Sequence, residues 1–392
     1  MSYRKLKADY LFDGFTLHGS DTVLICKPEG TVEAIVKEEL AGGEIESFQG
    51  LLSPGFINCH CHLELSHLKG QIPGKQGLVD FVLSVVSHRM ETQESILAAM
   101  HAAESQMQEA GIVAVGDICN TADSLVVKSS GRLFYYNFIE LLGWSPAQAV
   151  SRFNNGKALA ELFIQNLKDE DHLSLNPHAP YSISPELWDL MIPEFRGKTI
   201  TIHNQESADE NEFFETGAGG LPGMYERLKI DNAHFKAHGK HSLPVYLNKL
   251  KTASRILLVH NTYMDNADIT LALGFHQGLF LCLCPNANQY IENRLPDVPA
   301  LIKRNSAVVL GTDSLASNRQ LSILEEMKLI KQHFPFIPTS SMLVWATSNG
   351  ARALSFDNKL GDFAKKKKPG IVLIEHITDG EIGAESSCRR IV

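Results

Sequence analysis

The feature that most constrains the fold is a series of eight short apolar segments in the middle of this 392-residue chain. Most of them are continuously apolar, which is typical of parallel strands buried on both faces. Longer stretches with helical periodicity separate them, including residues 79–90, 95–110, 147–166 and 322–333. The eight segments are residues 56–62, 112–119, 133–140, 172–178, 199–203, 255–260, 279–284 and 307–313.

Eight strand–helix units in series predict an α/β fold of the (β/α)₈ TIM-barrel type, because doubly wound sheets more often have about five to seven strands. The two ends of the chain differ from the middle, with short strand-like segments broken by Gly, Pro and Asp turns. We therefore expect residues 56–357 to form the barrel. Residues 1–55 and 358–392 are expected to form one small composite β-sandwich together.

Composition limits the classes of function. Hydrophobic residues make up 44% of the chain and charged residues 21%, which excludes a largely disordered protein. The formal net charge of -9 argues against nucleic acid as a partner, and the basic run at residues 365–368 is interpreted as a solvated turn. No apolar stretch reaches the roughly 18 residues needed to cross a bilayer, and no signal-peptide core follows the first residues. We expect a cytoplasmic protein without a membrane partner.

Two histidines stand at the end of the first apolar segment, in the sequence His60-Cys61-His62. Because side chains alternate between the two faces of a strand, His60 and His62 point to one side and Cys59 and Cys61 to the other. The two histidine Cα atoms are about 7 Å apart by strand rise, so both imidazoles can bind one metal ion. A zinc site that used all four side chains would require opposite faces of the strand to converge.

The fifth, sixth and eighth segments also end in residues that can bind a metal ion, namely His203, His260 and Asp313. A single His or Asp at a strand end is usually a satisfied core or capping residue. Together with the first pair, however, these residues share one edge of four strands, and barrel enzymes keep their active sites at the C-terminal ends of the strands. Three neutral imidazoles and a carboxylate suit Zn²⁺ or Fe²⁺ and leave a position open for water.

Four motifs occur in a fixed order, at residues 54–62, 203–206, 311–318 and 349–354. In this order they resemble the amidohydrolase superfamily. The branch that they resemble contains cytosine, guanine, S-adenosylhomocysteine and aminofutalosine deaminases alongside triazine hydrolases. The resemblance covers nearly the whole chain, although the tail departs from the usual pattern at residues 368–373.

The resemblance implies one divalent metal ion, held by His60, His62, His203 and Asp313. It implies that His260 orients the attacking water and helps to deprotonate it, and that Asp313 accepts a proton from it. Glu206, three residues after His203, resembles the proton shuttle of the deaminases. The fourth segment does not end in the lysine that bridges two metal ions in other relatives, so a site with one metal ion is expected.

The implied reaction is hydrolytic deamination of a small aminated heterocycle, with Zn²⁺ as the first choice of metal. An adenine-containing nucleoside such as aminodeoxyfutalosine is the preferred substrate class, and the family suggests a homodimer. Candidate substrate contacts are Glu64, Ser66, His178 and Asn286, each of which could instead serve as a capping or turn residue. The long, glycine-punctuated connection at residues 207–250 is a candidate lid.

Other reactions remain open at this point. Triazine chlorohydrolases and imidazolone-type ring hydrolases belong to the same superfamily, and guanine or cytosine deamination would need the same metal site. Glu206 favours deamination, because an amine leaving group must be protonated and chloride need not be. An inactive metal-binding scaffold is a remote alternative, since neither a ligand nor the proton shuttle is missing.

Overall fold

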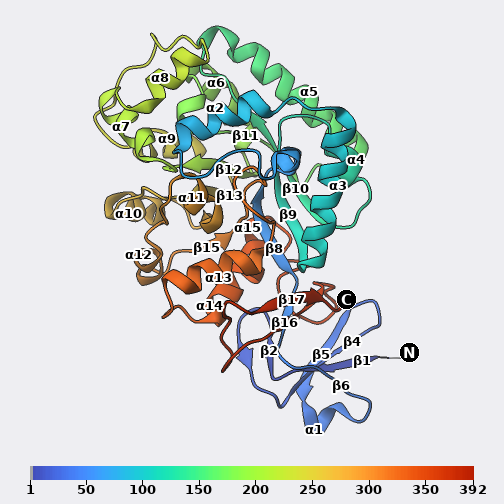
Figure 1. Ribbon diagram of the computed structural model, residues 1–392. Coiled ribbons are helices and arrows are strands. Elements are labelled where there is room, and N and C mark those ends of the chain that lie inside the picture. The colour runs from blue at the N-terminus through green and yellow to red at the C-terminus, as the bar shows by residue number, and fades with distance from the viewer. Residues whose placement is uncertain (1–2) are drawn as a thin grey trace.

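The computed structural model describes residues 3–392, and its larger part contains eight parallel strands in two four-stranded sheets (Figure 1). The strand orders are β11-β10-β9-β8 and β12-β13-β14-β15. These strands are β8 (Phe56–Cys61), β9 (Ile112–Cys119), β10 (Phe134–Leu141), β11 (Leu173–Pro177), β12 (Thr199–Asn204), β13 (Arg255–His260), β14 (Leu279–Leu283) and β15 (Val308–Leu310). The eight predicted strands are therefore confirmed, although β15 is shorter than expected and ends before Asp313.

The edges of the two sheets approach one another at two places. The backbone N–H of His203 on β12 donates to the carbonyl of His178, directly after β11, at 2.9 Å. At the other edge, Cys61 of β8 forms an isolated parallel bridge with Asp313, three residues after β15. These two contacts bring the C-terminal ends of strands from both sheets into one region.

Helices connect the parallel strands, as their periodicity predicted. Helix α3 begins after Thr92, whose hydroxyl accepts from the backbone N–H of Ser95. Its buried side chains include Met100 and Met107, which belong to the main apolar core. The four helices expected from the sequence are α2 (Leu78–His88), α3 (Gln93–Glu109), α5 (Ala149–Leu167) and α13 (Ile323–His333). Within residues 3–392, no helix has the length and apolar character needed to span a membrane.

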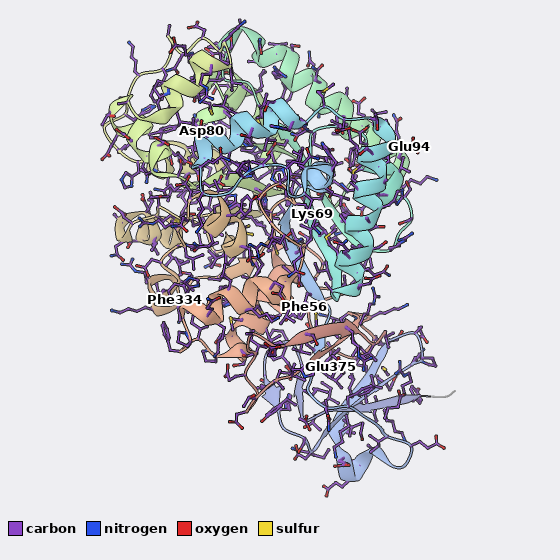
Figure 2. All side chains as sticks on the ribbon, in the orientation of Figure 1. Phe56, Lys69, Asp80, Glu94, Phe334 and Glu375 are labelled. Atoms are coloured by element: carbon purple, nitrogen blue, oxygen red, sulfur yellow. The ribbon has the colours of Figure 1, made fainter. Side chains whose placement is uncertain are left out.

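The smaller, β-rich part contains strands from both ends of the chain (Figure 1). One sheet has the order β17-β16-β7-β2-β3 and the other β5-β4-β1-β6. Phe56 lies where the chain leaves this part and enters β8, and Glu375 lies within it (Figure 2). The strands of the first sheet are β2 (Tyr10–Phe12), β3 (Leu17–His18), β7 (Leu51–Pro54), β16 (Ile371–Glu375) and β17 (Ser387–Arg390). Those of the second are β1 (Arg4–Lys7), β4 (Thr22–Cys26), β5 (Val32–Lys37) and β6 (Glu46–Ser47).

The long connection after β12 folds into three short helices. Its aromatic residues Phe213 and Tyr225 share a separate apolar cluster with Phe81 of α2. An exposed ion pair joins the same two regions, with 2.9 Å between Arg227 Nη1 and Asp80 Oδ1. The insertion is therefore packed onto α2 by an apolar cluster of its own. Its helices are α7 (Ala208–Thr216), α8 (Gly220–Arg227) and α9 (Leu243–Tyr246).

A fully buried ion pair supports the end of β8. Asp117 on β9 and Lys128 at the end of α4 (Leu125–Lys128) lie 2.6 Å apart, and both side chains are at most 1% exposed. The second oxygen of Asp117 accepts from the backbone N–H of Leu63 at 2.9 Å. Because Leu63 directly follows His62, this ion pair fixes the backbone that carries the histidine pair.

We expect Lys128→Met to lower the free energy of unfolding by about 3–5 kcal/mol, because it leaves the Asp117 carboxylate buried without its counter-charge. The matched control is Lys157→Met, which breaks a half-exposed pair with Glu194 and should cost no more than about 1 kcal/mol. Urea unfolding followed by circular dichroism measures both. Equal losses in the two variants would show that the buried pair has no special structural role.

Candidate active site

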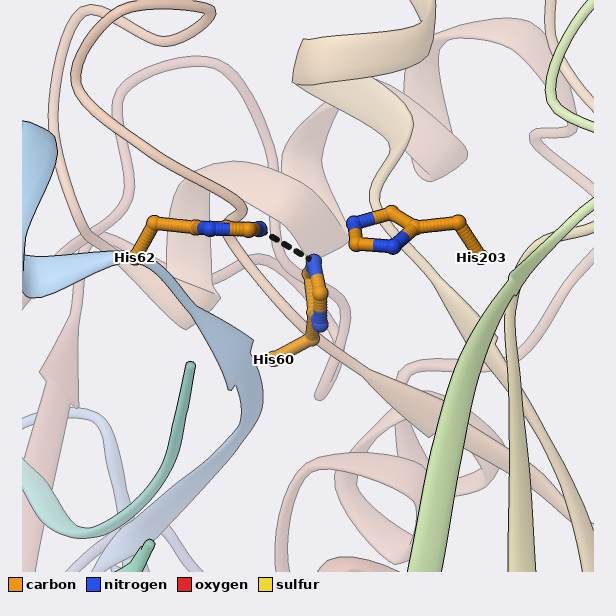
Figure 3. A group of neighbouring side chains, drawn as sticks. All are labelled: His60, His62 and His203. Atoms are coloured by element: carbon orange, nitrogen blue, oxygen red, sulfur yellow. Dashed lines mark hydrogen bonds between the residues drawn. The ribbon is translucent and has the colours of Figure 1, made fainter. Parts of the chain in front are cut away.

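The candidate metal site lies where the ends of β8 and β12 meet. His60 and His62 come from β8 and its end, and His203 comes from β12. Figure 3 shows their three rings pointing toward a common centre, with His62 and His203 on either side of His60. All three side chains are nearly inaccessible to solvent, His62 being the most exposed at 11%. The period-two argument from the sequence thus places His60 and His62 correctly.

The distances between the candidate ligand atoms fit a single metal ion. The Nε2 atoms of His60 and His62 are 3.2 Å apart, and Oδ1 of Asp313 lies 3.6 and 3.4 Å from them respectively. In a tetrahedral site with metal–ligand bonds of about 2.0–2.1 Å, neighbouring ligand atoms lie about 3.3–3.4 Å apart. Burial also lowers the pKa of both His60 and His203 to about 3, which keeps their imidazoles neutral and able to bind a metal ion.

Hydrogen bonds outside the cluster orient the candidate ligands. Nδ1 of His203 lies 2.7 Å from the carbonyl of His178 and must donate to it, which leaves Nε2 as the coordinating atom. Ser317 donates to Oδ2 of Asp313 at 2.5 Å, so Oδ1 remains toward the histidines. Asp313 itself has a left-handed backbone with φ of 57°. This uncommon conformation, for a residue just beyond β15, turns the carboxylate toward β8.

His260 and Glu206 lie beside this cluster. Nε2 of His260 is 3.6 Å from Oε1 of Glu206, and the ring of His260 lies 5.4 Å from that of His203. On its other side, Nδ1 of His260 is 3.2 Å from the side-chain amide of Asn288. Burial raises the pKa of Glu206, and the negative charge of Asp313 raises it further. The site therefore combines neutral imidazoles with a carboxyl group that tends to hold its proton.

The structure separates the four candidate substrate contacts into different environments. Both oxygens of Glu64 accept backbone N–H groups, and burial raises its pKa to about 7. Ser66 donates to the carbonyl of Leu63. The rings of His178 and His203 lie 4.7 Å apart. Of the two ring nitrogens of His178, only Nδ1 has a hydrogen-bond partner among the described residues. The side-chain nitrogen of Asn286 is buried and has no partner in residues 3–392.

One residue of this region was missed by the sequence analysis. Glu140 lies near the end of β10, with Oε1 3.9 Å from Nδ1 of His203 and a side chain that is 4% exposed. The sequence did contain one indication of its role. Glu140 is the last residue of the third apolar segment, and His60 and His203 also lie at the C-terminal ends of their segments. A lone Glu at a strand end is too common to be distinguished without its spatial neighbours.

We expect His62→Ala to reduce the zinc content of the purified protein from one equivalent per chain to well below half, because it removes one of four ligands. Metal content by plasma mass spectrometry and thermal unfolding would be measured together. The control is His333→Ala, an exposed histidine on α13 that bonds to a carbonyl of its own helix. Full zinc occupancy in a folded His62 variant would exclude His62 as a ligand.

Comparisons with known proteins identify the family of the chain. The amidohydrolase family model matches residues 51–382. An adenosine deaminase from Helicobacter pylori is 27% identical over 320 residues, covering 79% of this chain and 75% of its own. An aminodeoxyfutalosine deaminase from Deinococcus radiodurans is 28% identical over 319 residues, covering 78% and 73%.

A solved structure shares the fold along almost its whole length. Helicobacter pylori aminofutalosine deaminase, crystallised with methylthio-coformycin, has a TM-score of 0.78 and 22% sequence identity, covering 96% of this chain and 93% of its own. The family match extends over most of the chain and includes every residue of the candidate metal site. The chain belongs to the amidohydrolase family.

Proposed function

We propose that this protein is a metal-dependent hydrolase that deaminates an adenine-containing nucleoside. The observation that carries the proposal is the buried Glu206 carboxyl beside His260, next to a histidine cluster with metal-binding geometry. Two relatives named as deaminases of adenine compounds support this choice of substrate. A related structure that contains methylthio-coformycin, a nucleoside-type ligand, supports it as well.

The residues that would hold the metal ion are His60, His62, His203 and Asp313. Three imidazoles and one carboxylate match the preferences of Zn²⁺, with Fe²⁺ as the alternative. When bound, such an ion lowers the pKa of a water molecule toward 7 and so supplies a nucleophile at neutral pH. The distances between the ligand atoms of His60, His62 and Asp313 support one ion that these groups share.

The chain's own residues then manage the protons. Glu206, whose pKa is raised, would donate a proton to the ring nitrogen beside the reacting carbon, then take a proton from the attacking water and pass it to the departing amine. His260 would orient the attacking water through Nε2, because Asn288 holds the other side of its ring. Asp313 would accept from the same water. His178 and Asn286 retain polar atoms without partners and are proposed as substrate contacts.

The proposal extends to the architecture around the site. We propose that the eight strands close into one barrel at residues 56–357, supported by the contacts between the edges of the two sheets. The terminal segments 1–55 and 358–392 would form a composite β-sandwich, which is supported by the sheet that they share. The insertion at residues 207–250 would cover the site, and its packing on α2 supports this role. The homodimer and the cytoplasmic location stay predictions.

Two other hydrolytic reactions are alternatives to deamination. A triazine chlorohydrolase or an imidazolone-type hydrolase would use the same metal ligands, but a chloride leaving group needs no acid. Guanine and cytosine deamination would use the same acid and therefore differ only in the substrate. The buried Glu206 beside the site thus favours an amine leaving group. It does not distinguish between adenine, guanine and cytosine as the aminated ring.

We expect the zinc-loaded protein to release ammonia from an adenine nucleoside, and Glu206→Gln to slow this by about 10²–10⁴-fold with zinc retained. The panel contains adenosine, S-adenosylhomocysteine, aminodeoxyfutalosine, guanine, cytosine and a chlorotriazine, with ammonia and chloride measured in parallel. Glu212→Gln, an exposed change on α7, is the matched control. Chloride release without ammonia, or full activity of the Glu206 variant, would refute the proposed reaction.

A further inference from the structure

One buried carboxyl group beside the candidate site has no role in the proposed mechanism. Oε2 of Glu140 accepts from the side-chain amide of Asn120 at 2.9 Å. No hydrogen bond from residues 3–392 reaches Oε1, which lies on the side of His203. The Glu140 side chain is only 4% exposed, so few water molecules can reach this oxygen, and a donor on a bound ligand would be its direct partner.

A second metal ion does not explain the position of this oxygen. Glu140, His178 and His203 do lie close enough together to suggest such a site. Nδ1 of His203, however, already donates its proton to the carbonyl of His178, and a nitrogen that carries a proton cannot bind a metal ion. The missing partner is therefore a hydrogen-bond donor.

The neighbours of Glu140 hold its carboxyl group in a fixed orientation. Glu64 accepts the backbone N–H groups of Asn120 and Thr121 at 3.2 and 3.0 Å, which fixes the loop after β9. Arg89 donates to the side-chain oxygen of Asn120 at 3.3 Å, so the Asn120 amide nitrogen must face Glu140. Oε2 is thereby bound and Oε1 is left for a ligand. Both oxygens of Glu64 accept backbone N–H groups, so Glu64 orients the loop that carries Asn120.

We propose that Glu140 accepts a hydrogen bond from a ribose hydroxyl of the substrate and so makes the enzyme prefer ribonucleosides to their deoxy analogues. This inference rests on the proposed deamination of an adenine nucleoside. In the proposed reaction the amino group of the base faces Glu206, which follows β12. The sugar is at the other end of the nucleoside and would therefore be the part that approaches Glu140 on β10. Among the groups of an adenine nucleoside that remain, the ribose hydroxyls are the donors that match the free oxygen of Glu140.

The test compares kcat/KM for adenosine and for 2′,3′-dideoxyadenosine in the zinc-loaded protein. The wild type should prefer adenosine by about 10- to 100-fold, the size of one hydrogen bond to a charged group. Glu140→Gln should lose most of this preference, because Asn120 holds the amide oxygen and an N–H group then replaces Oε1. Zinc content should stay at one equivalent. Glu194→Gln, at a half-exposed surface pair, should keep the full preference.

Three outcomes would overturn the inference. If Glu140→Gln slows both nucleosides equally and loses zinc, Glu140 acts through His203 and not on the substrate. If the folded wild type turns over both nucleosides equally well, no hydroxyl is recognised, whatever the variant does. If the wild type deaminates neither nucleoside nor any other compound of the panel, the proposed function fails and the inference fails with it. Glu140→Asp, which withdraws the carboxylate, replaces the Gln variant if the latter does not fold.

Discussion

The buried cluster of imidazole and carboxyl groups at the ends of the strands sets the conditions for the rest of the site. His60 is fully buried, and Glu206 and Asp313 are at most 5% exposed. Removal from water makes charge costly, so burial lowers the pKa of the imidazoles and raises that of Glu206. These shifts keep the imidazoles available as ligands and keep a proton on the carboxyl group. Burying these ionisable groups costs folding free energy, but it also suits them to metal binding and acid catalysis.

Such a cluster must be held by groups outside it. The Asp117–Lys128 pair anchors the backbone after His62, and Glu64 anchors the loop after β9 in the same way. Left-handed backbone at His260 and Asp313 turns these side chains inward. The support therefore comes from charged groups that never face the metal position. The buried carboxylates of Asp117 and Glu64 both accept backbone N–H groups and so support the site.

The sequence predicted the features that depend on local periodicity. The eight parallel strands follow from continuous apolar segments, and the common face of His60 and His62 follows from alternation along β8. Other features depend on neighbours that are distant in sequence. Glu64 binds backbone atoms of residues 120–121, and Glu140 is recognisable only beside Asn120 and His203. The terminal strands β1, β3, β6, β7 and β17 were not predicted, because strands of two to four residues carry little periodic signal.

The most direct test of the account is the X-ray absorption fine structure of the zinc-loaded protein at the zinc edge. It probes the claim that one ion is bound by imidazoles and a carboxylate from separate strands. The proposed site predicts nitrogen and oxygen ligands at about 2.0–2.1 Å, imidazole outer-shell scattering and no second metal ion. A sulfur ligand at about 2.3 Å would instead place Cys59 or Cys61 at the metal and contradict the account. A metal–metal vector would contradict the single-ion site.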